Sequence, residues 1–165
     1  MNVDRVRKTN RLKGFDYSSS RSYFVTICTK DGVSLFWRWK RDINGRPQVA
    51  PTQEYELSPY GEIVTDEILQ ISLIYENVEV EHFVVMPNHV HMVLTICRGD
   101  LRSPVPTLSR IIQQWKGAIS KKMGFSPWQK SFHDHIIRDE KSFLEIAEYV
   151  RTNPENWESD KFYMR

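Results

Sequence analysis

Residues 86–94 read Met-Pro-Asn-His-Val-His-Met-Val-Leu, and this stretch decides the fold. Successive side chains of a strand point to opposite faces, so His89 and His91 share one face of an extended chain. The alternate residues Val90, Met92 and Leu94 then lie on the other face, in the core. A second apolar run at 78–86 ends just before Pro87-Asn88. Because so short a link permits only antiparallel pairing, we predict two paired strands at 78–86 and 89–97.

Working outward, the flanking segments carry clear helix and strand signals. Ser58 and Pro59 have the side chains that favour a helix cap and a first turn, and Asp139 favours a second cap. Pro154 cannot continue a helix, so the last helix ends near Thr152. The apolar spacing predicts helices at about 59–75, 107–123 and 140–152, strands at 22–29 and near 136–137, and a hairpin turn at 42–45. This order predicts an α+β fold, a ferredoxin-like antiparallel sheet with helices packed on one face and the histidine pair on a central strand.

Composition sets broad limits on the class of protein. The chain has 165 residues, 40% hydrophobic and 27% charged, which predicts one globular domain over 1–165. No segment approaches the roughly 20 apolar residues of a transmembrane helix, and two distant cysteines indicate a reducing, cytoplasmic setting. The net charge of +2 gives no argument for nucleic acid, but basic residues cluster in an N-terminal arm at about 1–20 and along the second helix.

The histidine pair has two readings. Two imidazoles side by side on a strand can share one divalent ion, whereas a polar pair on the solvated face of a half-buried sheet needs no ligand. His82 is a candidate third ligand. His133 and His135 form a second pair of the same spacing, so a closed site of four histidines is a further alternative.

The predicted third helix offers a nucleophile. Tyr149 and Asn153 are four residues apart and lie off the apolar face of that helix, so both can face a cleft. A tyrosine hydroxyl with a pKa near 10 is a weak nucleophile unless it is helped. A hard ion such as Mg²⁺ or Mn²⁺ on a phosphate supplies that help, and Asn153 is the candidate third ligand beside His89 and His91.

The sequence also resembles a known family. The segments that carry the resemblance span residues 11 to 157 in the order that the family has: 11–18, 23–29, 86–91, 128–132 and 148–154. They resemble the HUH endonuclease superfamily, within it the single-tyrosine (Y1) transposases of the IS200 type, and more specifically the REP-associated tyrosine transposases. The resemblance implies His89 and His91 as metal ligands, Tyr149 as nucleophile and Asn153 completing the metal site.

The resemblance further implies a DNA nicking and joining enzyme of bacterial chromosomes. Its substrate is single-stranded DNA at a hairpin of the REP palindrome type, cut through a 5′-phosphotyrosine intermediate. A monomer is expected, with a dimer left open, located in the cytoplasm and at the nucleoid when bound to DNA. Two departures, His133 in place of an aromatic residue and Arg21 in place of a glycine, bear on DNA contacts rather than on chemistry. The candidate DNA contacts are Arg11, Lys13, Lys116, Lys121, His133 and Arg138.

Two other functions compete with this one. A non-catalytic regulator could bind palindromic hairpins without cutting them. A metal-dependent hydrolase could use activated water, which would leave Tyr149 without a role.

Overall fold

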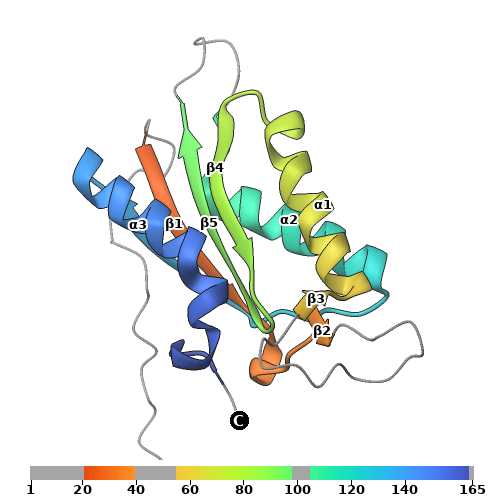
Figure 1. The fold of residues 1–165 in the computed structure, drawn as a ribbon. Helices are drawn as coiled ribbons and strands as arrows, with labels where there is room; N and C mark the ends of the chain where they lie inside the picture. The colour runs from red at the N-terminus through yellow and green to blue at the C-terminus, as the bar shows by residue number, and fades with distance from the viewer. Residues whose placement is uncertain (1–20, 40–54, 98–104, 164–165) are drawn as a thin grey trace, which may run out of the picture.

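A four-stranded antiparallel sheet forms the centre of the molecule, which we describe from a computed structural model over residues 21–39, 55–97 and 105–163 (Figure 1). The strands are β1 (Arg21–Cys28), β4 (Val78–Val85), β5 (His89–Ile96) and β6 (His133–Ile137), in the order β4-β5-β1-β6. The two histidines therefore lie on an interior strand, as predicted. In the β1–β5 pair, Thr26 stands opposite His91 and Cys28 opposite His89.

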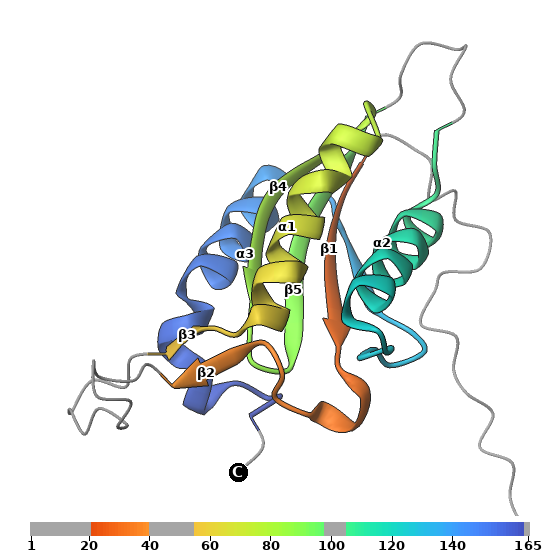
Figure 2. The same ribbon diagram turned by 90° about the vertical axis from the view of Figure 1, so that its right-hand side faces the viewer.

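Three helices cover this sheet, two on one face and one on the other. Helices α1 (Pro59–Ile74) and α2 (Leu108–Met123) lie on the same face, whereas α3 (Glu140–Thr152) crosses the opposite face (Figure 2). The main elements follow one another as strand, helix, two strands, helix and strand. Together with the strand order β4-β5-β1-β6, this is the ferredoxin-like arrangement. The prediction of an α+β, ferredoxin-like fold is confirmed. No helix in the described ranges has the length and apolar character needed to cross a membrane.

The expectation that all helices pack on one face is wrong. Val90, Met92 and Leu94 belong to the larger core, under α1 and α2, but the intervening Val93 is equally buried on the other face. There Val93 packs with Ile137 and with Val150 of α3. Val93 follows His89 and His91 on the same face of β5 and gives α3 an apolar residue to pack against. The face of the sheet that carries the histidines is therefore covered as well.

The predicted helix starts are present. The Ser58 hydroxyl accepts a hydrogen bond from Gly61 N at 3.2 Å, and the Asp139 carboxylate accepts one from Ser142 N at 2.8 Å. Each bond satisfies a backbone N–H that the first helical turn leaves unpaired. Beyond α3 the chain continues as a 3₁₀ segment, η2 (Asn153–Ser159), which begins at the residue before Pro154.

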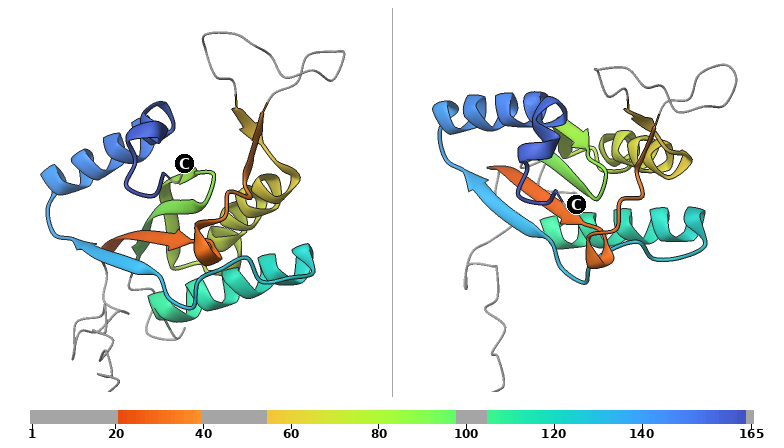
Figure 3. Two further views of the ribbon diagram at one scale, coloured as in Figure 1. Left: turned by 90° about the horizontal axis from the view of Figure 1, so that it is seen from below. Right: turned by 60° about the horizontal axis from the view of Figure 1, so that its bottom comes forward.

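Smaller elements lie at the end of the sheet where the β4–β5 hairpin turns. They are a 3₁₀ turn, η1 (Lys30–Gly32), and a two-stranded sheet of β2 (Trp37–Trp39) and β3 (Tyr55–Leu57). The hairpin turn predicted at 42–45 and the basic arm at about 1–20 lie outside the described residues. Figure 3 shows the C-terminal segment turning back from α3 toward the same end of the sheet.

Candidate active site

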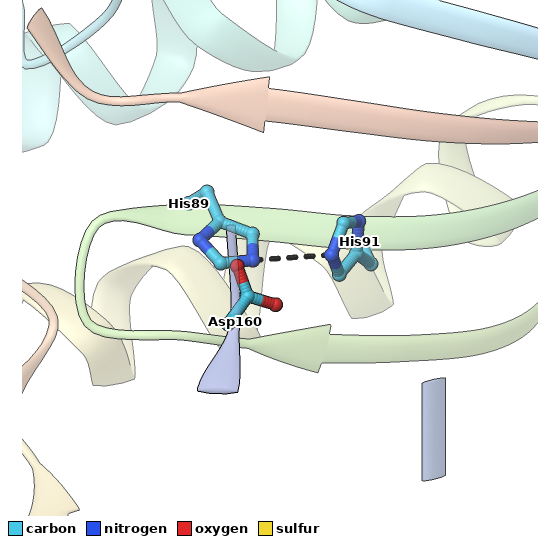
Figure 4. A group of neighbouring side chains, drawn as sticks. All are labelled: His89, His91 and Asp160. Atoms are coloured by element: carbon cyan, nitrogen blue, oxygen red, sulfur yellow. Dashed lines mark hydrogen bonds between the residues drawn. The ribbon is translucent and has the colours of Figure 1, made fainter. Parts of the chain in front are cut away.

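His89 and His91 are the most deeply buried polar residues of the sheet, with 0% and 1% of their surfaces exposed. Their Nε2 atoms face each other at 3.1 Å (Figure 4). This separation suits two ligands of one ion, because metal–nitrogen bonds are about 2.1 Å long. The reading of the pair as solvated surface residues is wrong, since α3 and the C-terminal segment cover them.

A hydrogen bond behind each imidazole fixes its orientation. His89 Nδ1 lies 2.9 Å from Asn88 Oδ1, and His91 Nδ1 lies 2.8 Å from Thr26 Oγ1. An amide oxygen only accepts, so His89 carries its proton on Nδ1 and presents a bare Nε2 lone pair. His91 presents a second lone pair once its Nδ1–H donates to Thr26. Such outer bonds hold metal-binding histidines in the tautomer that a metal requires.

The electrostatics of the pair also suit a metal. Burial lowers the pKa of His89 to about 4, with the Asp160 carboxylate acting to raise it and the Lys161 ammonium to lower it. Burial lowers the pKa of His91 further, and the neighbouring His89 and Lys161 add to the effect. Both imidazoles are therefore neutral at pH 7, the form in which histidine binds metals.

Asp160 joins the two histidines in a group able to hold a metal ion, which the sequence did not reveal. One ligand atom from each of His89, His91 and Asp160 lies within 4.8 Å of the other two (Figure 4). Two nitrogens and a carboxylate oxygen form a donor set for a divalent ion that leaves positions open for substrate. Asp160 lies beyond Pro154, where the helix periodicity stops, so no sequence pattern connects it with the histidines.

The C-terminal segment is held in place over the histidines. Asp160 Oδ1 accepts from Phe162 N at 2.7 Å, and Asn88 Nδ2 donates to Phe162 O at 2.8 Å. The ring of Phe162 packs 4.6 Å from that of His89. The buried Trp157 anchors η2 against Trp37, with ring centroids 6.4 Å apart. Asn88 therefore supports the site twice, through His89 and through the segment that carries Asp160.

Asn153, the predicted third ligand, lies beside Asp160. It is 3% exposed, and its Nδ2 donates to Asp160 Oδ2 at 3.2 Å. Its Oδ1 is buried and has no hydrogen-bond partner among the described residues. A buried amide oxygen without a partner costs free energy, and an ion or an ordered water would satisfy it. Direct metal ligation by Asn153 stays a prediction.

Tyr149 reaches the same site from α3. Its hydroxyl lies 3.3 Å from His91 Nε2 and donates to Asp160 Oδ2 at 3.4 Å, while 40% of the residue stays exposed. Partial burial raises the pKa of the phenol, the Asp160 charge raises it further, and a hydrogen bond from Asn153 acts to lower it. The phenol is thus protonated at neutral pH and must lose its proton to act as a nucleophile.

An open cavity adjoins the tyrosine. It has a volume of about 430 Å³, and its lining residues are Tyr149, Thr152, Asn153, Asn156, Ser159, Asp160 and Lys161. All of them come from the end of α3 and the segment that follows. Tyr149 thus stands between the buried histidines and a cavity open to solvent.

The remaining histidines lie away from the site. His82 is exposed on β4 and packs against Phe143, with ring centroids 5.7 Å apart. His133 and His135 are exposed on the edge strand β6, where His133 pairs with Thr26 on β1. The closed site of four histidines is therefore not formed, and His82 is not a ligand. His133 does project to the same face of the sheet as His91, because paired residues share a face.

The predicted DNA contacts are distributed over the molecule. Lys116 and Lys121 belong to α2, on the sheet face opposite Tyr149, and the Lys116 ammonium donates to the carbonyls of Gln129 and Ser131, both at 2.8 Å. Arg138 lines a separate cavity of about 460 Å³ at the start of α3. Arg11 and Lys13 lie outside the described residues. A DNA-binding role for each of these residues and for His133 stays a prediction.

Comparison with known proteins finds a relative by sequence and several solved structures of related fold. No family model matches the chain. An uncharacterized protein of Haemophilus influenzae is 32% identical over 179 aligned positions, which cover 96% of this chain and 93% of the relative. A REP-associated tyrosine transposase bound to a REP hairpin superposes with a TM-score of 0.63 at 19% identity, over 89% of this chain and 74% of the other. A putative transposase from Deinococcus radiodurans has a TM-score of 0.48 at 16% identity, over 86% and 95% of the two chains.

Proposed function

We propose that this chain is a metal-dependent enzyme that nicks and joins single-stranded DNA. It belongs to one family with the Haemophilus influenzae protein, and it has the fold of a single-tyrosine transposase. One observation carries the proposal. The Tyr149 hydroxyl lies within 3.4 Å of both His91 and Asp160, two of the three residues able to hold one ion. A nucleophile and a metal-binding group thus share one site beside an open cavity.

His89, His91 and Asp160 would hold the ion, with Asn153 available through its unpartnered Oδ1. When bound there, a divalent ion would supply Lewis-acid polarisation of the scissile phosphate and would stabilise charge on the departing oxygen. The ligand set is mixed, and a carboxylate beside two imidazoles suits Mg²⁺ or Mn²⁺ when water and phosphate supply further oxygens.

Tyr149 acts as the nucleophile. Its oxygen forms a bond to phosphorus as the bond from phosphorus to the 3′-oxygen breaks, and the 3′-oxygen leaves with a proton taken from water. Two acceptors for the phenol proton lie within reach, His91 Nε2 and Asp160 Oδ2. Both residues would be engaged as ligands when an ion is held, so water in the adjoining open cavity takes the phenol proton. The product is a 5′-phosphotyrosine and a free 3′-hydroxyl, and reversal with another 3′-hydroxyl joins strands.

The proposed substrate is single-stranded DNA next to a hairpin. The structural relative with a TM-score of 0.63 is bound to a REP hairpin, and this chain superposes on it over 89% of its own length. A half-exposed tyrosine on the rim of a cavity can reach a single strand, whereas a buried one could not. We propose that the protein works as a monomer, because Tyr149 and Asp160 reach the histidines of their own chain.

The test uses hairpin-bearing single-stranded oligonucleotides with flanks of random sequence, incubated with Mg²⁺ or Mn²⁺. Wild type should give a covalent protein–DNA adduct on a denaturing gel, and Tyr149→Phe should give none while still binding. Tyr60→Phe, on the other face of the sheet, is the matched control and should form the adduct. Binding without cleavage by wild type would favour the non-catalytic regulator instead. Cleavage by Tyr149→Phe without an adduct would favour water as the nucleophile.

A further inference from the structure

Lys161 is the cation that lines the cavity next to Tyr149, and nothing in the chemistry above uses it. Every other residue of the cavity is neutral apart from Asp160. The nearby Arg151 forms two hydrogen bonds with the Glu148 carboxylate, at 2.6 and 2.9 Å, so its charge is already paired. Within the described residues, the Lys161 ammonium makes no salt bridge. It lies 4.8 Å from the centre of the Phe162 ring.

The backbone around Lys161 is fixed relative to the metal-binding group. Asp160 on one side presents its carboxylate to the histidines, and Phe162 on the other side bonds to Asn88 and packs against His89. Lys161 and Tyr149 line the same cavity, so the flexible lysine stem can bring the charge to the tyrosine hydroxyl.

The proposed reaction calls for such a charge. A phosphodiester carries one negative charge, and attack by the phenol oxygen adds a second once its proton is lost. The ion is partly neutralised by Asp160, so one more cation near the non-bridging oxygens stabilises the transition state. Lysine suits this role as a compact point charge on a flexible stem. A contact with an aromatic ring at an exposed position is weak, so a phosphate can readily draw the ammonium away.

We infer that Lys161 binds the scissile phosphate of single-stranded DNA, pairing its ammonium with a non-bridging oxygen while Tyr149 attacks. The inference rests on the proposed function, but it concerns a residue that the metal site does not require. It also makes the C-terminal segment bifunctional, because adjacent residues supply a metal ligand and a phosphate contact.

Two measurements test this role. The first is the single-turnover rate of adduct formation, in which Lys161→Met should be slower by about 10- to 100-fold and Lys161→Arg should recover most of the rate. Lys141→Met removes the same charge from the start of α3 and should react as wild type does. The second is metal-free binding of the same oligonucleotides by Tyr149→Phe at several salt concentrations. There, adding Lys161→Met should reduce the slope of log affinity against log salt by about 0.7, the value for one phosphate of a single strand.

The outcomes separate this inference from the proposed function. If wild type forms no adduct, the proposed function fails, yet the salt slope still decides whether Lys161 contacts a phosphate. If wild type forms the adduct and Lys161→Met matches it in rate and slope, the inference alone is overturned. A Lys161→Met protein with weakened Mn²⁺ binding would also overturn it, because the lysine would then act by positioning Asp160. Lys161→Gln gives the same comparison if the methionine variant is poorly folded.

Discussion

Thr26→Val tests the hydrogen bond that orients His91. Thr26 is 5% exposed on β1, and its Oγ1 lies 2.8 Å from His91 Nδ1. Valine keeps the branched shape and removes the hydroxyl, so the imidazole loses the partner that favours a proton on Nδ1. The Nε2 lone pair is then no longer held ready for the ion.

The size of the effect follows from this contact. Loss of the partner behind a metal-binding histidine lowers metal affinity by about 10- to 100-fold, which corresponds to about 1.4–2.7 kcal/mol. The metal-free protein should also be less stable by about 1–3 kcal/mol, because His91 Nδ1 is left buried without a partner. Neither change requires the imidazole to leave its place in the core.

Calorimetric titration with Mn²⁺ measures the first effect and thermal unfolding of the metal-free protein the second. Thr95→Val is the matched control, because Thr95 lies on β5 in the same strand pair and bonds to Ser22 Oγ at 2.8 Å, away from the histidines. It should leave Mn²⁺ affinity unchanged. Mn²⁺ affinity equal to wild type in Thr26→Val would refute the reasoning that this bond prepares His91 for a metal.

Three further predictions follow from the same contacts. Asp160→Asn keeps an oxygen for the Phe162 N–H but loses the charge. Titration should show that Mn²⁺ affinity falls at least about tenfold, while the thermal midpoint stays near that of wild type. Unchanged affinity would remove Asp160 from the ligand set. A chelator should abolish adduct formation and Mn²⁺ should restore it on the same gel, whereas activity that survives chelation would contradict a metal-dependent step. Gly61→Ala would bring a Cβ into steric conflict with the Phe36 carbonyl oxygen. Denaturant unfolding should therefore show a free energy of unfolding lower by about 1–3 kcal/mol. An unfolding midpoint equal to that of wild type would show that α1 can shift freely.

The sequence by itself determined the four strands of the main sheet, the three α-helices and the face that each catalytic candidate occupies, but it did not predict the small β2–β3 sheet. Alternation along 86–94 placed His89 and His91 together, and the i, i+4 relation placed Tyr149 and Asn153 on one side of a helix. These are local relations, set by the periods of 2 and 3.6 residues, so they can be read without knowing what packs against what. The helix starts at Ser58 and Asp139 were predictable for the same reason, since a cap bonds only three residues away.

Only the tertiary structure decided that the histidines are buried, that Asp160 joins them and that Thr26 and Asn88 orient them. Each of these facts depends on contacts between segments far apart in the chain, such as Thr26 with His91 and Asn88 with Phe162. The sheet register and the packing of α3 on Val93 create these contacts, and neither leaves a periodic mark in the sequence. The histidine pair and the tyrosine could therefore be recognised separately in the sequence. Their assembly into one site with Asp160 follows from how α3 and the segment after it fold back over the sheet.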